Sequence, residues 1–290
     1  MSHLAGRPPV TLTVVGADID HPECVAWDPV SGWLVTGTEA GGLLWLDPAS
    51  GEVRRSLTVG RGFIGGLALD AAGRVYACDV AERRVLRADP TDGSVVTWSS
   101  GPTDAPFLLP NYPVFDATGR LWVSDSGDWG SGNGRLVVIE ADGRTARVVS
   151  TEANGFTNGL AIDPSGDWLY VAESTPPLVS RLRILADGTL GPREVVLELP
   201  RTVPDGLAFT ADGGLLISCY RPDAVYLWDG QWLDPLAEDW SGIVLIAPTN
   251  VAFSGPELDT LWAANLGGGH LTRLDAGLVG SPLRYPAIGS

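Results

Sequence analysis

NYPVFDATGRLWVSD, residues 111–125, is the most informative stretch of this chain, because it holds a complete strand–turn–strand unit. A short apolar run ends at Asp116, the turn residues Ala-Thr-Gly-Arg follow, and a second apolar run ends at Asp125. Apolar runs of this length bounded by Asp and Gly are typical of β-hairpins. The stretch therefore predicts two antiparallel strands joined by a tight turn.

The same unit occurs six times along the sequence. Its first strands read ECVAWD (23–28), GGLALD (65–70), NYPVFD (111–116), NGLAID (158–163), DGLAFT (205–210) and TNVAFS (249–254). Successive repeats are 42 to 47 residues apart, which is the length of a four-stranded propeller blade. Helical periodicity is absent at useful length. We therefore expect an all-β, six-bladed β-propeller of four-stranded antiparallel blades, a single domain over residues 1–290 with blades starting near 23, 65, 111, 158, 205 and 249.

The two ends of the chain are expected to close the ring. The last repeat is one strand short, whereas the apolar run at residues 10–16 belongs to no repeat. Open sheet edges are a liability that radial closure removes. The segment 10–16 is therefore predicted to complete the sixth blade as its closing strand.

Composition excludes several classes of partner and site. The 290 residues include 35 acidic and 19 basic side chains, all of the latter Arg, so the formal net charge is -16. Such a charge repels phosphate backbones and anionic lipid surfaces, which argues against nucleic acid and membrane partners. Three cysteines without a CxxC pair suggest buried free thiols. Without a secretory leader or a long apolar run, a cytoplasmic location is expected.

The residues that open the six first strands should meet at one end of the channel, because the first strand of a blade is the innermost. They are Glu23, Gly65, Asn111, Asn158, Asp205 and Thr249. Two carboxylates that converge in a channel repel each other unless a cation lies between them. Oxygen donors without Cys or His favour calcium, magnesium or manganese over structural zinc. The Asp residues at the opposite strand ends, such as Asp70 and Asp116, are interpreted as turn caps.

These motifs resemble the senescence marker protein/gluconolactonase/luciferin-regenerating-enzyme-like family. The resemblance rests on PECVAW at residues 22–27, residues 110–125, TNGLAIDPSGDWLYVAES at residues 157–174, VPDGLAF at residues 203–209 and PTNVAF at residues 248–253. It implies a calcium-dependent six-bladed propeller lactonase whose metal is held by Glu23, Asn158 and Asp205, with Asn111 nearby for metal or substrate. Two positions depart from the family pattern. Cys24 stands where a Gly is usual, and Leu109 stands where sugar lactonases often have Arg, which argues against a sugar-acid lactone.

The activity that the resemblance implies is metal-dependent hydrolysis of a lactone or related ester. Asp205 is expected to serve as metal ligand and general base, and Glu23 and Asn158 as ligands only. One divalent ion is expected, calcium first, with zinc, manganese and magnesium as alternatives. Rival hypotheses are a metal-free enzyme resembling strictosidine synthase and a non-enzymatic binding scaffold. A phosphotriesterase would be a variant of the hydrolase. The expected partner is a small-molecule substrate, and the sequence does not predict an oligomeric state.

A substrate rim is expected where the second strands end on the same face. The residues at those ends are Asp79, Asp125, Glu173, Tyr220 and Asn265. Polar strand ends are also common simply because they face water. His270, in the sequence GGGH, is interpreted as an exposed loop residue in preference to a proton shuttle at the rim. The candidates for contact with substrate are Asn111, Asp125, Glu173, Tyr220 and His270.

Overall fold

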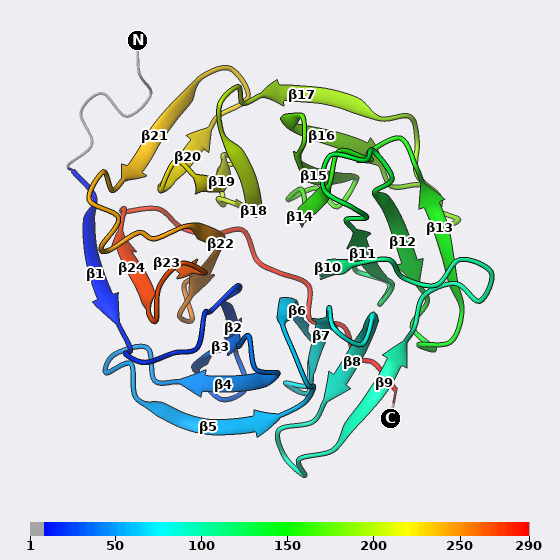
Figure 1. Ribbon diagram of the computed structural model, residues 1–290, viewed down its shortest axis with the longest axis horizontal. Helices are drawn as coiled ribbons and strands as arrows, with labels where there is room; N and C mark the ends of the chain where they lie inside the picture. Colours follow the sequence, from blue (N-terminus) through cyan, green and yellow to red (C-terminus); the bar gives the residue numbers. More distant parts are fainter. Residues whose placement is uncertain (1–8, 290) are drawn as a thin grey trace.

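Six β-sheets stand around a central axis like the blades of a propeller (Figure 1). The computed structural model describes residues 9–289, and in this part of the chain each sheet has four antiparallel strands and there is no helix. Nothing among the described residues is a helix that could span a membrane. The six-bladed propeller predicted from the repeats is confirmed.

The strands follow the chain order blade by blade. Blade 1 contains β2 (Ala26–Asp28), β3 (Trp33–Gly37), β4 (Gly42–Leu46) and β5 (Val53–Thr58), and blade 2 contains β6 (Ile64–Leu69), β7 (Val75–Asp79), β8 (Arg84–Ala88) and β9 (Val95–Ser99). Blade 3 contains β10 (Pro110–Phe115), β11 (Leu121–Asp125), β12 (Arg135–Ile139) and β13 (Ala146–Ser150), and blade 4 contains β14 (Thr157–Ile162), β15 (Trp168–Ser174), β16 (Pro177–Arg183) and β17 (Glu194–Glu198). Blade 5 contains β18 (Val203–Phe209), β19 (Leu215–Arg221), β20 (Ala224–Trp228) and β21 (Leu233–Glu238), and blade 6 contains β22 (Pro248–Ser254), β23 (Thr260–Asn265), β24 (Leu271–Asp275) and β1 (Thr11–Val15).

Blade 6 is assembled from both ends of the chain, as the sequence predicts. Strand β1 is its outermost strand and pairs antiparallel with β24, with Thr11 opposite Asp275 and Val15 opposite Leu271. The edge of β24 is thereby covered, and the ring is closed by backbone hydrogen bonds.

Aspartates form the tight turns after the first strands. The Oδ1 atom of Asp116 accepts hydrogen bonds from the backbone N–H groups of Thr118 at 2.8 Å and Arg120 at 3.1 Å. Its Oδ2 accepts from the Arg120 guanidinium at 2.8 Å and from Trp122 Nε1 at 3.1 Å. Asp70 makes the corresponding bonds to Ala72 and Arg74. The predicted turn-capping role of these aspartates is confirmed.

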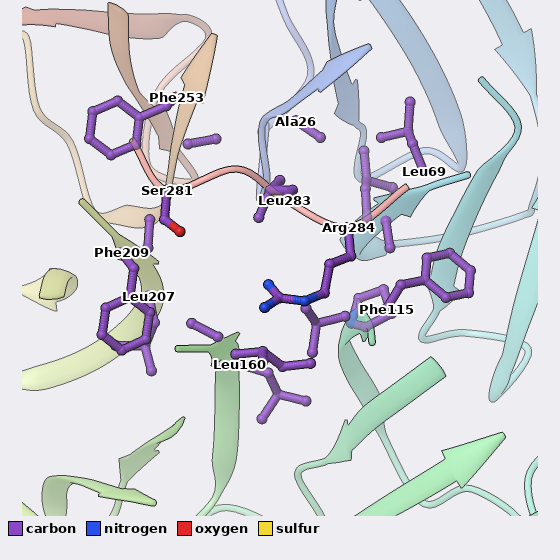
Figure 2. A pocket seen from close by; sticks show the side chains of 18 of the residues that line it. Ala26, Leu69, Phe115, Leu160, Leu207, Phe209, Phe253, Ser281, Leu283 and Arg284 are labelled. Atoms are coloured by element: carbon purple, nitrogen blue, oxygen red, sulfur yellow. The ribbon is translucent and has the colours of Figure 1, made fainter. Parts of the chain in front are cut away.

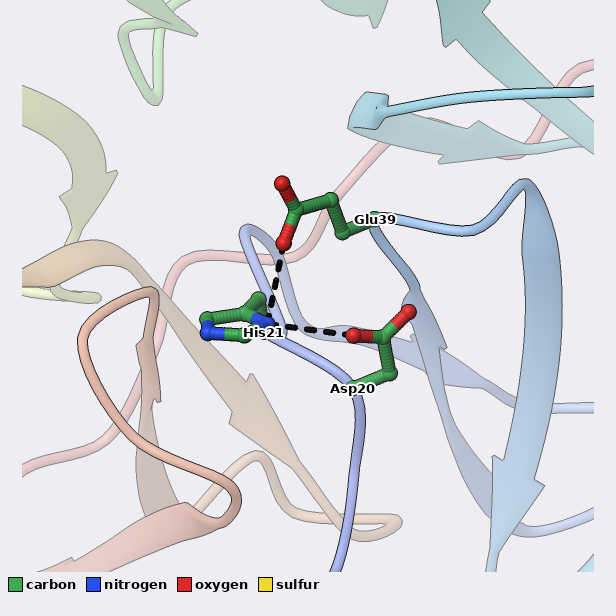
Figure 3. Close-up of side chains that lie close together, drawn as sticks. All are labelled: Asp20, His21 and Glu39. Atoms are coloured by element: carbon green, nitrogen blue, oxygen red, sulfur yellow. Dashed lines mark hydrogen bonds and ion pairs between the residues drawn. The ribbon is translucent and has the colours of Figure 1, made fainter.

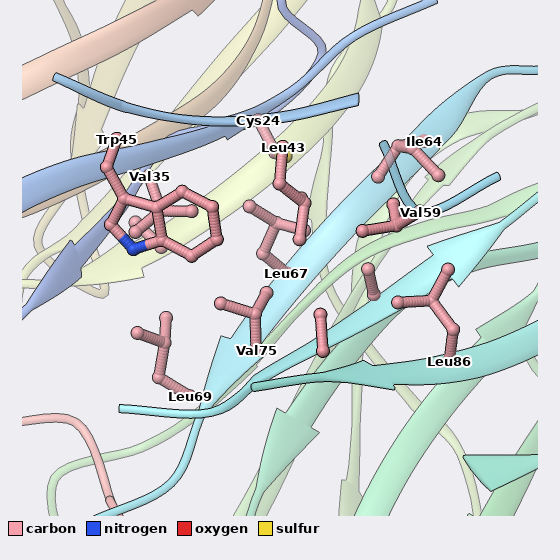
Figure 4. Packing of buried hydrophobic residues seen from close by; sticks show 13 residues of the cluster. Cys24, Val35, Leu43, Trp45, Val59, Ile64, Leu67, Leu69, Val75 and Leu86 are labelled. Atoms are coloured by element: carbon pink, nitrogen blue, oxygen red, sulfur yellow. The ribbon is translucent and has the colours of Figure 1, made fainter. Parts of the chain in front are cut away.

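Neighbouring blades pack through apolar side chains (Figure 4). Between blades 1 and 2, Val35, Leu43 and Trp45 pack with Leu67 and Val75, and all five are at least 95% buried. Similar clusters lie at the other contacts between blades. Cys24, Cys78 and Cys219 are buried free thiols, as predicted.

Glycines let the innermost strands approach one another at the axis. A Cβ at Gly159 would lie 2.3 Å from the carbonyl oxygen of Asp205, and one at Gly206 would lie 2.6 Å from the Cα of Asn250. No larger residue fits at these contacts without a shift of the backbone. The first strands of blades 4, 5 and 6 are therefore held at a spacing that only glycine permits.

The C-terminal segment, residues 276–289, crosses the far end of the channel, and we call it the strap (Figure 1, red). The backbone N–H of Ser281 donates to Phe209 O in blade 5 at 2.8 Å. In blade 2, Ala71 N donates to Pro286 O at 3.0 Å. The Tyr285 hydroxyl donates to Trp27 O in blade 1 at 3.1 Å. The strap therefore ties together blades on opposite sides of the ring.

Candidate functional site

The site is built at the end of the channel where the first strands begin. Glu23 lies three residues before the start of β2, Asn158 lies in β14 and Asp205 lies in β18. Thr249, the second residue of β22, donates its hydroxyl to the carbonyl oxygen of Glu23 at 2.6 Å. The strap lies against the opposite ends of the same strands. The fold thus brings to one place residues that are nearly two hundred positions apart.

The charges of Glu23 and Asp205 act on each other. Burial raises the pKa of Glu23 to about 8, and a hydrogen bond from Thr249 opposes this rise. Burial and the negative charge of Glu23 raise the pKa of Asp205 well above its usual value, and the side chain of Asn158 opposes the rise. Two carboxyl groups in one buried site cannot both ionise at low cost. Without a cation, ionisation of both members of this pair is therefore disfavoured.

Two oxygen atoms of this group have no hydrogen-bond donor. Glu23 Oε2 and Asn158 Oδ1 are buried and have no partner among the described residues. Buried acceptors are rarely left without a partner, because the lost hydration is not replaced. Carboxylate and amide oxygens are the ligands that calcium and magnesium prefer. The donor set therefore fits a hard divalent cation, which would satisfy both orphan oxygens and balance the two carboxylates.

A tyrosine and an asparagine form a floor beneath these residues. The Nδ2 of Asn250 donates to the hydroxyl of Tyr112 at 3.0 Å, although blades 3 and 6 lie across the channel from each other. Asn250 Oδ1 accepts from Val25 N at 3.0 Å. Burial, the Cys24 thiol and the charge of Asp205 raise the pKa of Tyr112, so this hydroxyl stays protonated. The pair spans the channel just below the site.

This floor was missed by the sequence analysis, although the sequence carries a signal for it. The second residues of the six first strands are Cys24, Gly66, Tyr112, Gly159, Gly206 and Asn250. Three of the six are glycines, and a Cβ at Gly66 would lie 2.3 Å from the ring of Tyr112. Small residues in this layer therefore leave the space that Tyr112 and Asn250 fill.

The acidic ends of the second strands occupy a different place from the expected rim. Asp125 and Glu173 are 0% and 1% exposed. Asp125 pairs with Arg135 at 2.7 Å and accepts from the backbone of Leu109 at 2.6 Å. Glu173 pairs with Arg193 at 2.7 Å and accepts from backbone N–H groups at 154 and 155. These bonds hold the loops that lead into β10 and β14, so both carboxylates fix the entry of an inner strand rather than face a substrate.

The three remaining candidates for contact with substrate lie in different surroundings. Asn111 lies at the start of β10, partly exposed, with its carbonyl oxygen against Gly65 of blade 2. Tyr220, near the end of β19, is partly exposed and lies under the Arg221 guanidinium at 4.6 Å. His270 is 9% exposed, and its Nε2 lies 3.0 Å from Val244 O. The interpretation of His270 as an exposed loop residue is therefore wrong, because a hydrogen bond across the loop orients and buries its ring.

Asp20, His21 and Glu39 form an exposed cluster, of which Asp20 and His21 lie just before Glu23 in the sequence (Figure 3). His21 Nδ1 is 3.0 Å from Asp20 Oδ1 and 3.0 Å from Glu39 Oε2. Asp20 Oδ2 also accepts from Ala40 N at 2.8 Å. All three side chains are solvent-exposed, and their contacts are those of an ordinary surface ion pair.

Comparison with known proteins places these features in context. A model of the SMP-30/Gluconolactonase/LRE-like region matches residues 17–265. A 6-deoxy-6-sulfogluconolactonase from Pseudomonas putida is 27% identical over 234 residues, which cover 65% of this chain and 77% of that protein. A pentonolactonase, XacC, from Haloferax volcanii is 25% identical over 270 residues, which cover 83% of this chain and 88% of that protein.

Solved structures share the fold at lower identity. A gluconolactonase from Xanthomonas campestris superposes with a TM-score of 0.80 at 22% identity, over 96% of this chain and 93% of that one. A calcium-binding protein from Agrobacterium tumefaciens, regucalcin, superposes with a TM-score of 0.77 at 18% identity, over 97% of this chain and 98% of that one. At these identities the likeness shows that the fold is shared and nothing more.

Proposed function

The chain belongs to the SMP-30/Gluconolactonase/LRE-like family, and we propose that it hydrolyses a lactone or related ester with one divalent metal ion. The observation that carries the proposal is the group of Glu23, Asn158 and Asp205, with two mutually repelling carboxyls and two buried oxygens that lack donors. The names of the two curated relatives, both lactonases, support the reaction class.

Glu23, Asn158 and Asp205 would hold the metal, and calcium is the first choice because all the donors are oxygen atoms. Magnesium, manganese and zinc are the alternatives. When bound, such an ion polarises a carbonyl oxygen and lowers the pKa of water. Glu23 and Asn158 would act as metal ligands only. Asp205, which the Asn158 side chain contacts, would accept the proton of the attacking water.

The floor and the buried ion pairs have supporting roles in this proposal. Tyr112 and Asn250 join blades 3 and 6 across the channel below the site. Asp125 and Glu173 keep the entries of β10 and β14 in place. The position of Asn111 at the mouth suits contact with the substrate or a further ligand to the metal. Leu109 in place of Arg favours a substrate other than the lactone of a sugar acid.

Elemental analysis of the purified protein, followed by a lactone and ester screen with and without chelator, tests the proposal. We expect about one divalent ion per chain and hydrolysis that stops on chelation and returns with calcium. Turnover that is insensitive to chelation would favour a metal-free enzyme. A metal-free protein without turnover on any lactone, ester or phosphotriester would favour a binding scaffold.

Two substitutions separate the roles of the carboxylates. Asp205→Asn should abolish hydrolysis and keep measurable metal binding, since the amide oxygen still coordinates but accepts no proton. Glu23→Gln should weaken metal binding, and excess calcium should restore part of the activity. Full turnover of Glu23→Gln without added metal would contradict the assignment of Glu23 as a ligand.

A further inference from the structure

A cavity lies in the channel at the end away from Glu23. It is enclosed by the first strands of the six blades and by strap residues 281–285 (Figure 2). Its volume is about 80 Å³. Tyr112, which forms the floor of the candidate metal site, is also part of its wall. The cavity therefore lies on the other side of this floor and is separate from the site described above.

The wall of this cavity is apolar almost throughout. Leu69, Phe115, Leu160, Phe209 and Phe253 line it from five different blades. Each lies near the end of a first strand, where the inner faces of the blades converge. Leu283 of the strap also lines it and is 53% exposed, so the wall is reachable from solvent beside the strap. An apolar ligand group inside the cavity would displace water, which makes few hydrogen bonds to such a wall.

Two polar side chains of the strap break this apolar wall. In Figure 2 the guanidinium of Arg284 extends into the middle of the cavity, and the hydroxyl of Ser281 points into the cavity from another side. Within residues 9–289 the guanidinium of Arg284 donates one hydrogen bond, to Pro164 O at 3.4 Å, which is at the upper limit of length. No carboxylate of residues 9–289 lies within 4.0 Å of this guanidinium, whereas Arg74, Arg84 and Arg135 all have one.

From this arrangement we infer that the cavity binds a small free monocarboxylate with an apolar body. The carboxylate pairs with the two parallel N–H donors of Arg284, which match its planar geometry. The hydrocarbon part lies against Leu160 and the aromatic side chains. Charge complementarity selects the anion, because the cavity offers one positive group and no negative one. The narrow space between the strap and six strands excludes a polypeptide or a lipid surface.

The affinity of such a site should depend both on the length of the hydrocarbon chain and on the carboxylate. Each methylene that enters the apolar wall should strengthen binding about fourfold. The charged hydrogen bonds to Arg284 should contribute at least a tenfold preference for a carboxylate over the alcohol of the same length. A site made only of apolar surface would show the first effect without the second.

Calorimetric titration of the full-length protein with butanoate, hexanoate and octanoate, with 1-octanol as the neutral comparison, tests the inference. We expect affinity to rise about sixteenfold from hexanoate to octanoate and octanoate to bind at least tenfold more tightly than 1-octanol. Arg284→Gln should weaken octanoate at least tenfold and leave 1-octanol unchanged. Arg144→Gln, which removes an exposed arginine outside the cavity wall, should change neither.

Three results would overturn the inference. One is equal affinity of the native protein for octanoate and 1-octanol, which needs no variant and stands even if Arg284→Gln does not fold. Another is octanoate binding that Arg284→Gln leaves intact. The third is loss of octanoate binding on addition of EDTA, because it would place the carboxylate on the metal instead of Arg284.

Discussion

Replacing Glu23 by Gln in the metal-free protein should change how stability depends on pH. The raised pKa of Glu23, about 8 against an ordinary 4.5, means that the folded state holds a proton which the unfolded chain has released between these two values. The free energy of unfolding therefore falls as pH rises through this window. Gln is neutral at every pH and carries no such cost.

The size of the effect follows from the same pKa. A rise from 4.5 to about 8 corresponds to up to about 5 kcal/mol, or about 1.4 kcal/mol for each pH unit. For a chain of this size that equals roughly 2 to 3 °C in Tm per pH unit. Metal-free Glu23→Gln should match the native protein near pH 5 and exceed it progressively up to pH 8.

The assay is thermal unfolding in EDTA at intervals from pH 5 to pH 8, followed by circular dichroism. Glu257→Gln is the matched control, because Glu257 is exposed and its replacement should leave the slope unchanged. Saturating calcium should remove most of the pH dependence of the native protein, since the ion takes the place of the proton. Parallel slopes for native protein and Glu23→Gln would refute the reasoning that Glu23 is buried beside a second carboxyl group.

Three further predictions concern the scaffold. Arg135→Met removes the partner of the fully buried Asp125 and should lower the free energy of unfolding in urea by about 3 kcal/mol; a loss below 1 kcal/mol would speak against this role. Gly159→Ala places a Cβ 2.3 Å from the Asp205 carbonyl, so metal affinity should fall in calcium titrations, whereas Gly289→Ala, with nothing within 4 Å, should leave it unaltered. Deleting residues 1–16 removes β1 and leaves β24 without its outer partner, so light scattering should report more association than for the intact protein.

The fold could be predicted from the sequence because each blade repeats the same strand–turn–strand pattern. Asp116 caps its turn through atoms that lie within six residues of it, so the signal is contained in one short stretch. The meeting of Glu23, Asn158 and Asp205 could also be predicted, since radial symmetry superimposes equivalent positions of different blades. Their roles in metal binding stay a prediction.

What the sequence could not predict depends on contacts between unlike segments. Asp125 was expected at the rim because the second strands end on the face of the site, but it is buried against Arg135 from the next strand. His270 follows three glycines, which suggested a loose loop; yet a Cβ at Gly267 would lie 2.7 Å from Ile246, so these glycines permit tight packing. The strap has no alternating pattern, and its partners lie in blades far from it in the sequence.

The pairing of β1 with β24 has a consequence for biosynthesis. Strand β1 must wait for its partner β24, which is encoded about 260 residues later. At about 5 to 20 residues per second the delay is on the order of 13 to 50 seconds. Until β24 has been synthesised, the nascent chain therefore exists as an unclosed array of blades.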